Sequence, residues 1–332
     1  MIERPPEKLV RLFKSCLSHA EKQAVMGVLD REFLGMGAEV QQFERALTSF
    51  FGRPATCVVN GTAAVHVAVQ ACGLGPDDEV LVPSLTFVAS FQAVSATGAR
   101  PVPCDIEADM CILDWRDAER RLTSRTRAVM PVHYAGGVGD LDAIYAFADR
   151  HGLRVIEDAA HAFGTTHHGE RVGSFGDIAC FSFDGIKNIT SGEGGCIITD
   201  DEVVLQRARD ARLLGVQGDT EKRYASARSW TFDVTAPGWR YHMSNIMAAI
   251  GIAQLTGEVA RSGVSSIVEF TALLSINLAI LNILPIPALD GGRIFFVVIE
   301  WLRGGKKIAP AREGFVHFIG FVVLLTMIAI IS

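Results

Sequence analysis

The chain has 332 residues, of which 49% are hydrophobic and 20% charged, and its formal net charge is −6. This length suggests two domains. Lysine and arginine form no concentrated stripe, which argues against nucleic-acid binding. The seven cysteines are scattered and odd in number, which favours reduced thiols over a disulfide framework. Residues 1–20 carry charges throughout, so no secretory signal peptide is expected.

Apolar periodicity predicts helices within residues 7–50, interrupted by a glycine-containing loop at residues 33–37. Beyond residue 55, apolar runs alternate with amphipathic stretches, and helices are expected at positions such as 63–72 and 141–151. The predicted strands are residues 55–59, 79–82, 100–104, 126–132, 154–157, 178–183 and 196–199. This alternation predicts an α/β fold with a mostly parallel sheet covered on both faces by helices. Ligands of such sheets collect at the carboxyl ends of the strands.

Two of these strand ends carry residues suited to one cofactor. Lys187 follows strand 178–183 in a loop that glycines at 192–195 close, and Asp158 follows strand 154–157. A lysine can hold pyridoxal phosphate covalently, while an aspartate keeps the pyridine nitrogen protonated so that the ring accepts electrons. Taken singly, a surface lysine and a helix-capping aspartate are the simpler interpretation. Together, the two strand ends favour the cofactor.

With these segments, residues 1–255 resemble the DegT/StrS family of nucleotide-sugar aminotransferases. The resemblance implies the aspartate-aminotransferase-like large domain (pyridoxal-phosphate fold type I) and a cytoplasmic homodimer. It also implies amination of a nucleotide-linked keto-sugar, with the keto group at position 4, by an amino-acid donor such as L-glutamate. Lys187 would be the catalytic residue, because it would bind pyridoxal 5′-phosphate and move a proton during the reaction.

The resemblance also assigns residues that bind the cofactor. Gly61 and Thr62 open a helix after the first strand, where free N–H groups and the helix dipole attract a phosphate. Ser182 would donate to the same phosphate, and His161 would contact the phenolic oxygen of the ring. Phe87 would stack on the ring, although a phenylalanine in the core explains this position equally well.

Three further positions carry weaker signals. Segment 236–245 resembles the family segment that reaches across a dimer to the phosphate of the neighbour, and Arg240 stands where many members have asparagine. A guanidinium could serve a phosphate as well. His133 is expected to be structural. His167 and His168, taken with Glu170, could suggest a metal, but no third ligand stands at a suitable spacing. A solvated hairpin turn over residues 168–170 is expected there, and no functional metal.

The composition changes near residue 255. Residues 270–286 and 314–331 are apolar runs, and the second is long enough to span a bilayer. Residues 282–292 close the first run, and residues 251–332 resemble the carboxy-terminal part of the site-2 intramembrane zinc metalloproteases. In those proteases the aspartate corresponding to Asp290 binds zinc. The His-Glu-x-x-His pair that zinc hydrolysis needs is absent, so Asp290 would be a lone ligand without proteolytic function.

These observations predict a chimera joined at residues 251–255. Its first part, residues 1–255, would be an aminotransferase large domain without the small domain, and its activity is expected to suffer. Its second part, residues 256–332, would be a two-span α-helical membrane hairpin that associates with the membrane through residues 270–331. The alternative function is a membrane-anchored, inactive remnant of a protease.

Overall fold

The computed structural model describes residues 14–225, 231–261 and 301. The chain divides into two compact units, residues 1–257 and 258–332. Within the described residues, no helix combines the length and the apolar character that crossing a membrane would need. The two predicted spans, residues 270–286 and 314–331, lie outside the described residues, as does Asp290.

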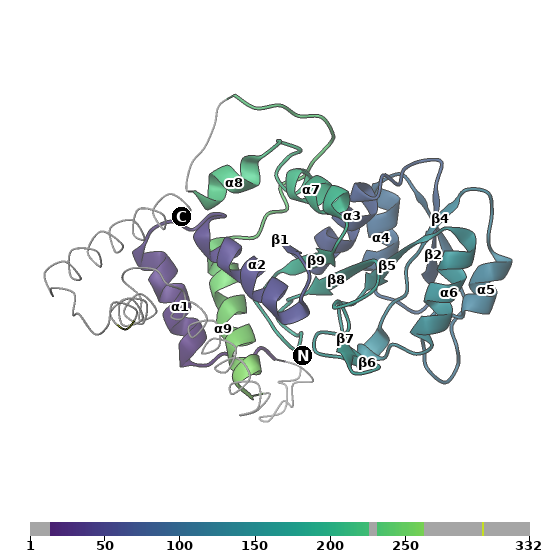
Figure 1. The fold of residues 1–332 in the computed structure, drawn as a ribbon, viewed down its shortest axis with the longest axis horizontal. Helices are drawn as coiled ribbons and strands as arrows, with labels where there is room; N and C mark the ends of the chain where they lie inside the picture. Colours follow the sequence, from purple (N-terminus) through teal and green to yellow (C-terminus); the bar gives the residue numbers. More distant parts are fainter. Residues whose placement is uncertain (1–13, 226–230, 262–300, 302–332) are drawn as a thin grey trace, which may run out of the picture. The chain divides into compact units, whose positions relative to one another are not determined.

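The centre of the first unit is a seven-stranded sheet with the strand order β1-β9-β8-β5-β4-β2-β3 (Figure 1). Neighbours from β8 to β3 pair in parallel, whereas β9 runs antiparallel to β1 and β8, so the predicted mostly parallel sheet is confirmed. The strands are β1 (Ala55–Val58), β2 (Glu79–Pro83), β3 (Arg100–Cys104), β4 (Thr126–Val129), β5 (Arg154–Asp158), β8 (Ile178–Ser182) and β9 (Gly195–Thr199). A separate hairpin pairs β6 (Thr166–His167) with β7 (Glu170–Arg171).

The helices occupy most of the segments between these strands. They are α1 (His19–Asp30), α2 (Ala38–Phe51), α3 (Gly61–Ala71), α4 (Val88–Ala96), α5 (Trp115–Arg120), the 3-10 turn η1 (Tyr134–Gly136), α6 (Leu141–His151), α7 (Glu202–Ala211), α8 (Asp219–Tyr224) and α9 (Asn245–Arg261). The predicted break at residues 33–37 is confirmed. Residues 14–18 are not helical, because Ser18 caps α1 and its hydroxyl accepts a hydrogen bond from the N–H of Ala20.

Side chains at alternate positions of a strand pack in different cores, because successive side chains point to opposite faces of the sheet. Val80 and Val82 pack in the core that α3, α4 and α7 cover, whereas Leu81 packs in the core that α5 and α6 cover. A further core forms between α2, α9 and the β1–β9–β8 part of the sheet. Helices therefore cover both faces, and the carboxyl ends of the parallel strands are left to build a site.

The predicted junction at residues 251–255 lies inside one continuous helix, α9. Gly251 packs so tightly on α2 that an added Cβ would lie 2.5 Å from the ring of Phe43. Leu255 is 3% exposed and belongs to the same core. These residues are thus integrated into the core of the first unit.

Candidate active site

Strand order brings Lys187 and Asp158 to the same edge of the sheet. β5 and β8 are hydrogen-bonded neighbours in which Asp158 pairs with Cys180, so the chain leaving β8 passes beside the end of β5. β9 must approach closely here, because a Cβ on Gly195 would lie 2.6 Å from the carbonyl oxygen of Asn60. The glycine that begins β9 therefore allows β1 and β8 to present their ends together.

Lys187 is half-buried in a hollow of about 200 Å³ at this edge, which is lined by Ala135, Ala160, His161, Phe163, Ile186, Lys187 and Asn188. Burial lowers the pKa of its ammonium group, against the opposing attraction of Asp184 and Asp158. Among the described residues, no carboxylate lies within ion-pair distance of Lys187. The amine is therefore easier to deprotonate than an ordinary lysine, which suits a nucleophile or a base.

His161 lines the same hollow as Lys187. Its Nδ1 accepts a hydrogen bond from the N–H of Ala135 at 3.3 Å, and its ring meets that of Tyr134 edge-on at 6.3 Å. Burial and then the charge of Lys187 lower the pKa of His161, while Asp158 opposes them. A neutral ring whose Nδ1 accepts carries its proton on Nε2, so His161 can donate a hydrogen bond there.

Asp158 is 7% exposed and held by hydrogen bonds to both carboxylate oxygens. Oδ2 accepts from the hydroxyl of Ser90 at 2.7 Å, and Oδ1 accepts from the N–H of Ala160 at 3.2 Å. The hydroxyls of Thr86 and Ser90 lie 2.7 Å apart, so a chain of hydroxyls reaches the carboxylate. The sequence analysis missed Ser90, since nothing marks one serine within a helix of small and apolar residues.

A buried polar network lies behind the end of β5. Glu157 is fully buried and its carboxylate contacts His133 Nε2 and the hydroxyl of Tyr145, each at 2.6 Å. The backbone N–H of His133 donates to the carbonyl oxygen of Asp158 at 3.1 Å. His133 is therefore a structural residue, as predicted, and it fixes the strand that carries Asp158.

The start of α3 lies beside Ser182 and presents backbone N–H groups. The side chain of Asn60 caps the N–H of Ala63, and no described residue accepts a hydrogen bond from the N–H groups of Gly61 or Thr62. A Cβ on Gly61 would lie 2.8 Å from Cβ and 3.1 Å from the hydroxyl oxygen of Ser182, so glycine allows Ser182 to lie close to these donors. Two free N–H groups at a helix N-terminus with a hydroxyl beside them suit a phosphate.

Phe87 and Arg240 lie apart from these contacts. Phe87 directly precedes α4 and is 73% exposed, so the alternative of a core phenylalanine is wrong. Arg240 is exposed, and its backbone bridges to Leu213. The next residue, Tyr241, accepts a hydrogen bond from the N–H of Val59 close to the start of α3. A phosphate contact by Arg240 across a dimer remains a prediction.

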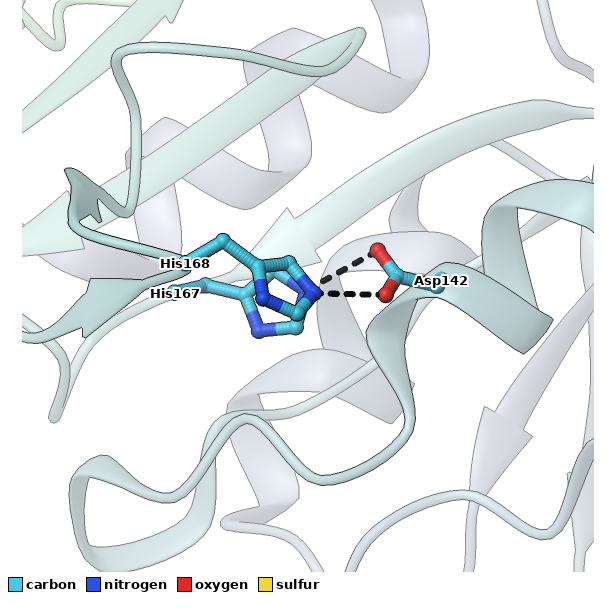
Figure 2. Close-up of side chains that lie close together, drawn as sticks. All are labelled: Asp142, His167 and His168. Atoms are coloured by element: carbon cyan, nitrogen blue, oxygen red, sulfur yellow. Dashed lines mark hydrogen bonds and ion pairs between the residues drawn. The ribbon is translucent and has the colours of Figure 1, made fainter.

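The histidine pair of the β6–β7 hairpin differs from expectation. The hairpin itself is confirmed, since His167 pairs with Glu170 and the turn lies at His168. A third candidate ligand that sequence spacing does not reveal is Asp142 of α6, which contacts both imidazoles (Figure 2). Sequence spacing could not show this contact, since Asp142 precedes His168 by 26 residues.

The group at the sheet edge fits pyridoxal phosphate on its own geometry. It offers a half-buried lysine, an oriented carboxylate, a histidine that can donate, and backbone N–H groups at a helix N-terminus next to a serine hydroxyl. These are the chemical complements of the aldehyde, the pyridine nitrogen, the phenolic oxygen and the phosphate of that cofactor.

Comparison with known proteins points the same way. A family model described as "DegT/DnrJ/EryC1/StrS aminotransferase family" matches residues 15–263. The chain is 42% identical over 236 residues to the spore coat polysaccharide biosynthesis protein SpsC of Bacillus subtilis (strain 168), covering 71% of this chain and 61% of SpsC.

Solved structures of sugar aminotransferases are similar in fold. The PLP-form of the putative sugar aminotransferase Spr1654 from Streptococcus pneumoniae has a TM-score of 0.68 and 29% identity, covering 74% of this chain and 66% of that one. DesV of S. venezuelae, solved in complex with a ketimine intermediate, has a TM-score of 0.64 and 36% identity, covering 71% of this chain and 61% of that one.

The comparisons do not support the expectation of a chimera. The family match continues to residue 263, past the predicted junction at residues 251–255, and those residues pack in the core of the first unit. Neither the fusion nor the protease remnant therefore finds support. The chain spans 61% of the length of SpsC, so the matched part corresponds to about three fifths of that relative.

Proposed function

The chain belongs to the DegT/DnrJ/EryC1/StrS aminotransferase family, and on this basis we propose that it transfers an amino group from an amino acid to a nucleotide-linked keto-sugar. The cofactor is pyridoxal 5′-phosphate, and the proposed amino-group donor is L-glutamate. The observation that carries the proposal is the meeting of Lys187 and Asp158 at one sheet edge, with His161 in the same hollow as Lys187.

Each residue of the site would hold one part of the cofactor. The N–H groups of Gly61 and Thr62 and the hydroxyl of Ser182 bind the phosphate, and Asp158, oriented by Ser90, binds the pyridine nitrogen. His161 donates from Nε2 to the phenolic oxygen. Phe87, exposed at the start of α4, can cover the ring face. When bound, the cofactor supplies an electron sink for the carbanion of the amino acid.

Lys187 would have two roles in the reaction. Its amine would hold the cofactor covalently, and as a free amine it would move a proton at the α-carbon of the donor amino acid. Burial lowers the pKa of Lys187, which raises the fraction of neutral amine near neutral pH. The carboxylate of Asp158, held by Ser90 and the N–H of Ala160, would pair with the pyridine nitrogen.

One feature supports position 4 for the keto group, and a second supports a sugar substrate. The segments 157–161 and 183–188 most resemble members that act on such sugars, apart from Asp184 and Gly185. SpsC, the relative with 42% identity, is named for spore coat polysaccharide biosynthesis. Amination of a keto-sugar suits the synthesis of such polymers.

We propose a homodimer in which Arg240 of one copy serves the phosphate of the other. This arginine is exposed, so it is free to reach a second copy. Residues 1–255 are proposed to form the large domain of the enzyme. A monomeric protein in sedimentation experiments would contradict the shared site.

The cofactor assignment is tested with the full chain and the variant Lys187→Ala. Wild-type protein should retain pyridoxal phosphate through desalting, show its visible absorbance, and carry the added mass on the peptide with Lys187 after borohydride treatment. Lys187→Ala should lose the visible band, whereas Lys22→Ala, at an exposed lysine of α1, should keep it. Unchanged absorbance in Lys187→Ala would overturn the assignment.

The substrate is tested with a nucleotide-linked 4-keto-sugar and L-glutamate. The expected result is 2-oxoglutarate in amounts equal to the amino-sugar formed, and no product from Lys187→Ala. Product from a 3-keto-sugar alone would retain the aminotransferase and exclude the 4-keto assignment.

A further inference from the structure

A cluster of two imidazoles and a carboxylate lies outside the proposed active site. His167 ends β6, His168 forms the turn of the β6–β7 hairpin, and Asp142 lies in the first turn of α6 (Figure 2). Their potential ligand atoms all lie within 4.8 Å of one another. Nothing in the proposed aminotransferase mechanism uses these three residues.

Local backbone structure brings the side chains of Asp142, His167 and His168 together. His168 has a φ of 51° and the following Gly169 a φ of 85°, so two consecutive left-handed residues turn the hairpin and bring the rings of His167 and His168 to 4.1 Å. The capping side chain of Asp140 accepts from the N–H of Ala143 at 3.1 Å and fixes the helix start that carries Asp142. The backbone positions from which the three side chains extend are therefore fixed by the hairpin turn and the capped helix start.

The distances match those between ligands of one metal ion. His167 Nε2 lies 3.0 Å from Asp142 Oδ1, and His168 Nε2 lies 2.7 Å from Oδ2. Two ligand atoms bound tetrahedrally to the same Zn²⁺ lie roughly 3.3 Å apart, given Zn–N and Zn–O distances of about 2.0–2.2 Å. A small outward movement of the carboxylate would admit the ion, which would replace the hydrogens shared with the two nitrogens.

We propose that Asp142, His167 and His168 form a Zn²⁺-binding site that joins the β6–β7 hairpin to the start of α6. Imidazole nitrogens suit Zn²⁺ and neighbouring transition metals, whereas Ca²⁺ and Mg²⁺ require oxygen ligands. Three protein ligands leave a fourth position for water. The side chains of Asp142 and His168 are 67% and 73% exposed, while that of His167 is 14% exposed, so the ion exchanges with solvent.

The site connects to the hollow around Lys187 through the backbone that precedes the hairpin. The hydroxyl of Thr165 donates to the carbonyl oxygen of Gly136 at 3.2 Å. Ala135, in the same turn η1, donates to His161 at 3.3 Å. Zinc would thus stabilise the hairpin next to the segment that positions His161, without touching the reacting groups.

The experiment titrates the untagged full chain, freed of metal by a chelator, with Zn²⁺ in competition with a chromophoric indicator. Wild-type protein should bind one equivalent. His168→Asn and Asp142→Asn should each bind at least about tenfold more weakly, because each removes a ligand. Asparagine at position 168 tolerates the left-handed backbone, so the hairpin is kept. Co²⁺ in place of Zn²⁺ should give visible absorption that both variants lose.

The matched control is His151→Asn, at the other end of α6. His151 lies 3.4 Å from Glu119, so it is also an imidazole next to a carboxylate, and its loss should leave the zinc affinity unchanged. Far-UV circular dichroism checks that each variant is folded. Wild-type protein that binds no equivalent of zinc, or His168→Asn that binds like wild type, would overturn the proposal.

Discussion

Arg212 and Lys187 are both basic side chains shielded from water, but they differ in whether a carboxylate pairs with their charge. Arg212 follows α7, is fully buried, and donates hydrogen bonds to the carboxylate of Glu44, the carbonyl oxygen of Cys57, and the hydroxyls of Thr220 and Tyr224. Lys187, at the sheet edge, is half-buried and has no carboxylate within ion-pair distance among the described residues.

The two environments shift the two pKa values in opposite directions. Burial works against the charge of Arg212, but the attraction of Glu44 and Tyr224 prevails and raises its pKa. Burial prevails at Lys187 and lowers its pKa. The paired guanidinium of Arg212 connects α2, β1 and α8 and contributes to stability. The ammonium group of Lys187, which has no ion-pair partner among the described residues, is available for chemistry.

Removing each charge in turn tests whether the two side chains contribute differently to the free energy of unfolding. Arg212→Met should lower the free energy of unfolding by about 3–5 kcal/mol, because it leaves Glu44 buried without its partner. In protein freed of cofactor, Lys187→Met should stay within about 0.5 kcal/mol of wild type, because no paired group is left behind. Urea denaturation followed by circular dichroism measures both.

A double variant separates pairing from packing. Glu44→Gln combined with Arg212→Met should recover part of the loss, since no uncompensated carboxylate remains. Equal destabilisation by Arg212→Met and Lys187→Met would contradict the distinction between the two charges.

A smaller effect is expected at the hydroxyl that orients Asp158. Ser90→Ala removes the donor at 2.7 Å from Oδ2 and should cost about 1–2 kcal/mol of stability, because a buried carboxylate oxygen loses its partner. The affinity for pyridoxal phosphate, measured by absorbance titration, should fall severalfold. Ser95→Ala, at an exposed serine of the same helix, is the control. Equal affinities in the two variants would remove Ser90 from the site.

The smallest effect concerns pH and the structural region around Arg212. Burial, and then Arg223, Arg240 and Arg212, lower the pKa of His242 to about 4 from its ordinary 6.5. The unfolded chain therefore takes up a proton below pH 6.5 that the folded chain refuses until about pH 4. His242 should thus make stability fall as the pH drops from 6.5 to 4, by about 1 kcal/mol once solvent screening is allowed for.

The measurement is the free energy of unfolding of wild type and His242→Gln at several pH values between 4 and 7. The variant should lose less stability than wild type on acidification. His19→Gln, at an exposed position of α1, should follow wild type. If the free energies of unfolding of wild type and His242→Gln change in parallel with pH, the burial of His242 does not contribute to the pH dependence of stability.

Much of the fold follows from local patterns. All seven strands of the sheet lie where the alternation of apolar and amphipathic segments predicts them, since each pattern depends on residues close together in the chain. The hairpin turn at His168 and the break at residues 33–37 also follow from local sequence. The change of composition near residue 255 led to the prediction of a fusion, which the family match over residues 15–263 does not support.

Local patterns in the sequence are enough to place the strands and to put Lys187 and Asp158 at strand ends. The pairing of β8 with β5, the contact of Ser90 with Asp158 across 68 residues, and the contact of Asp142 with the histidine pair arise from the packing of the whole domain. The physical reason is that periodicity and turn preference act within a few residues. Contacts between distant residues depend instead on how the helices and strands pack together, which is fixed by the burial of apolar surface over the whole domain.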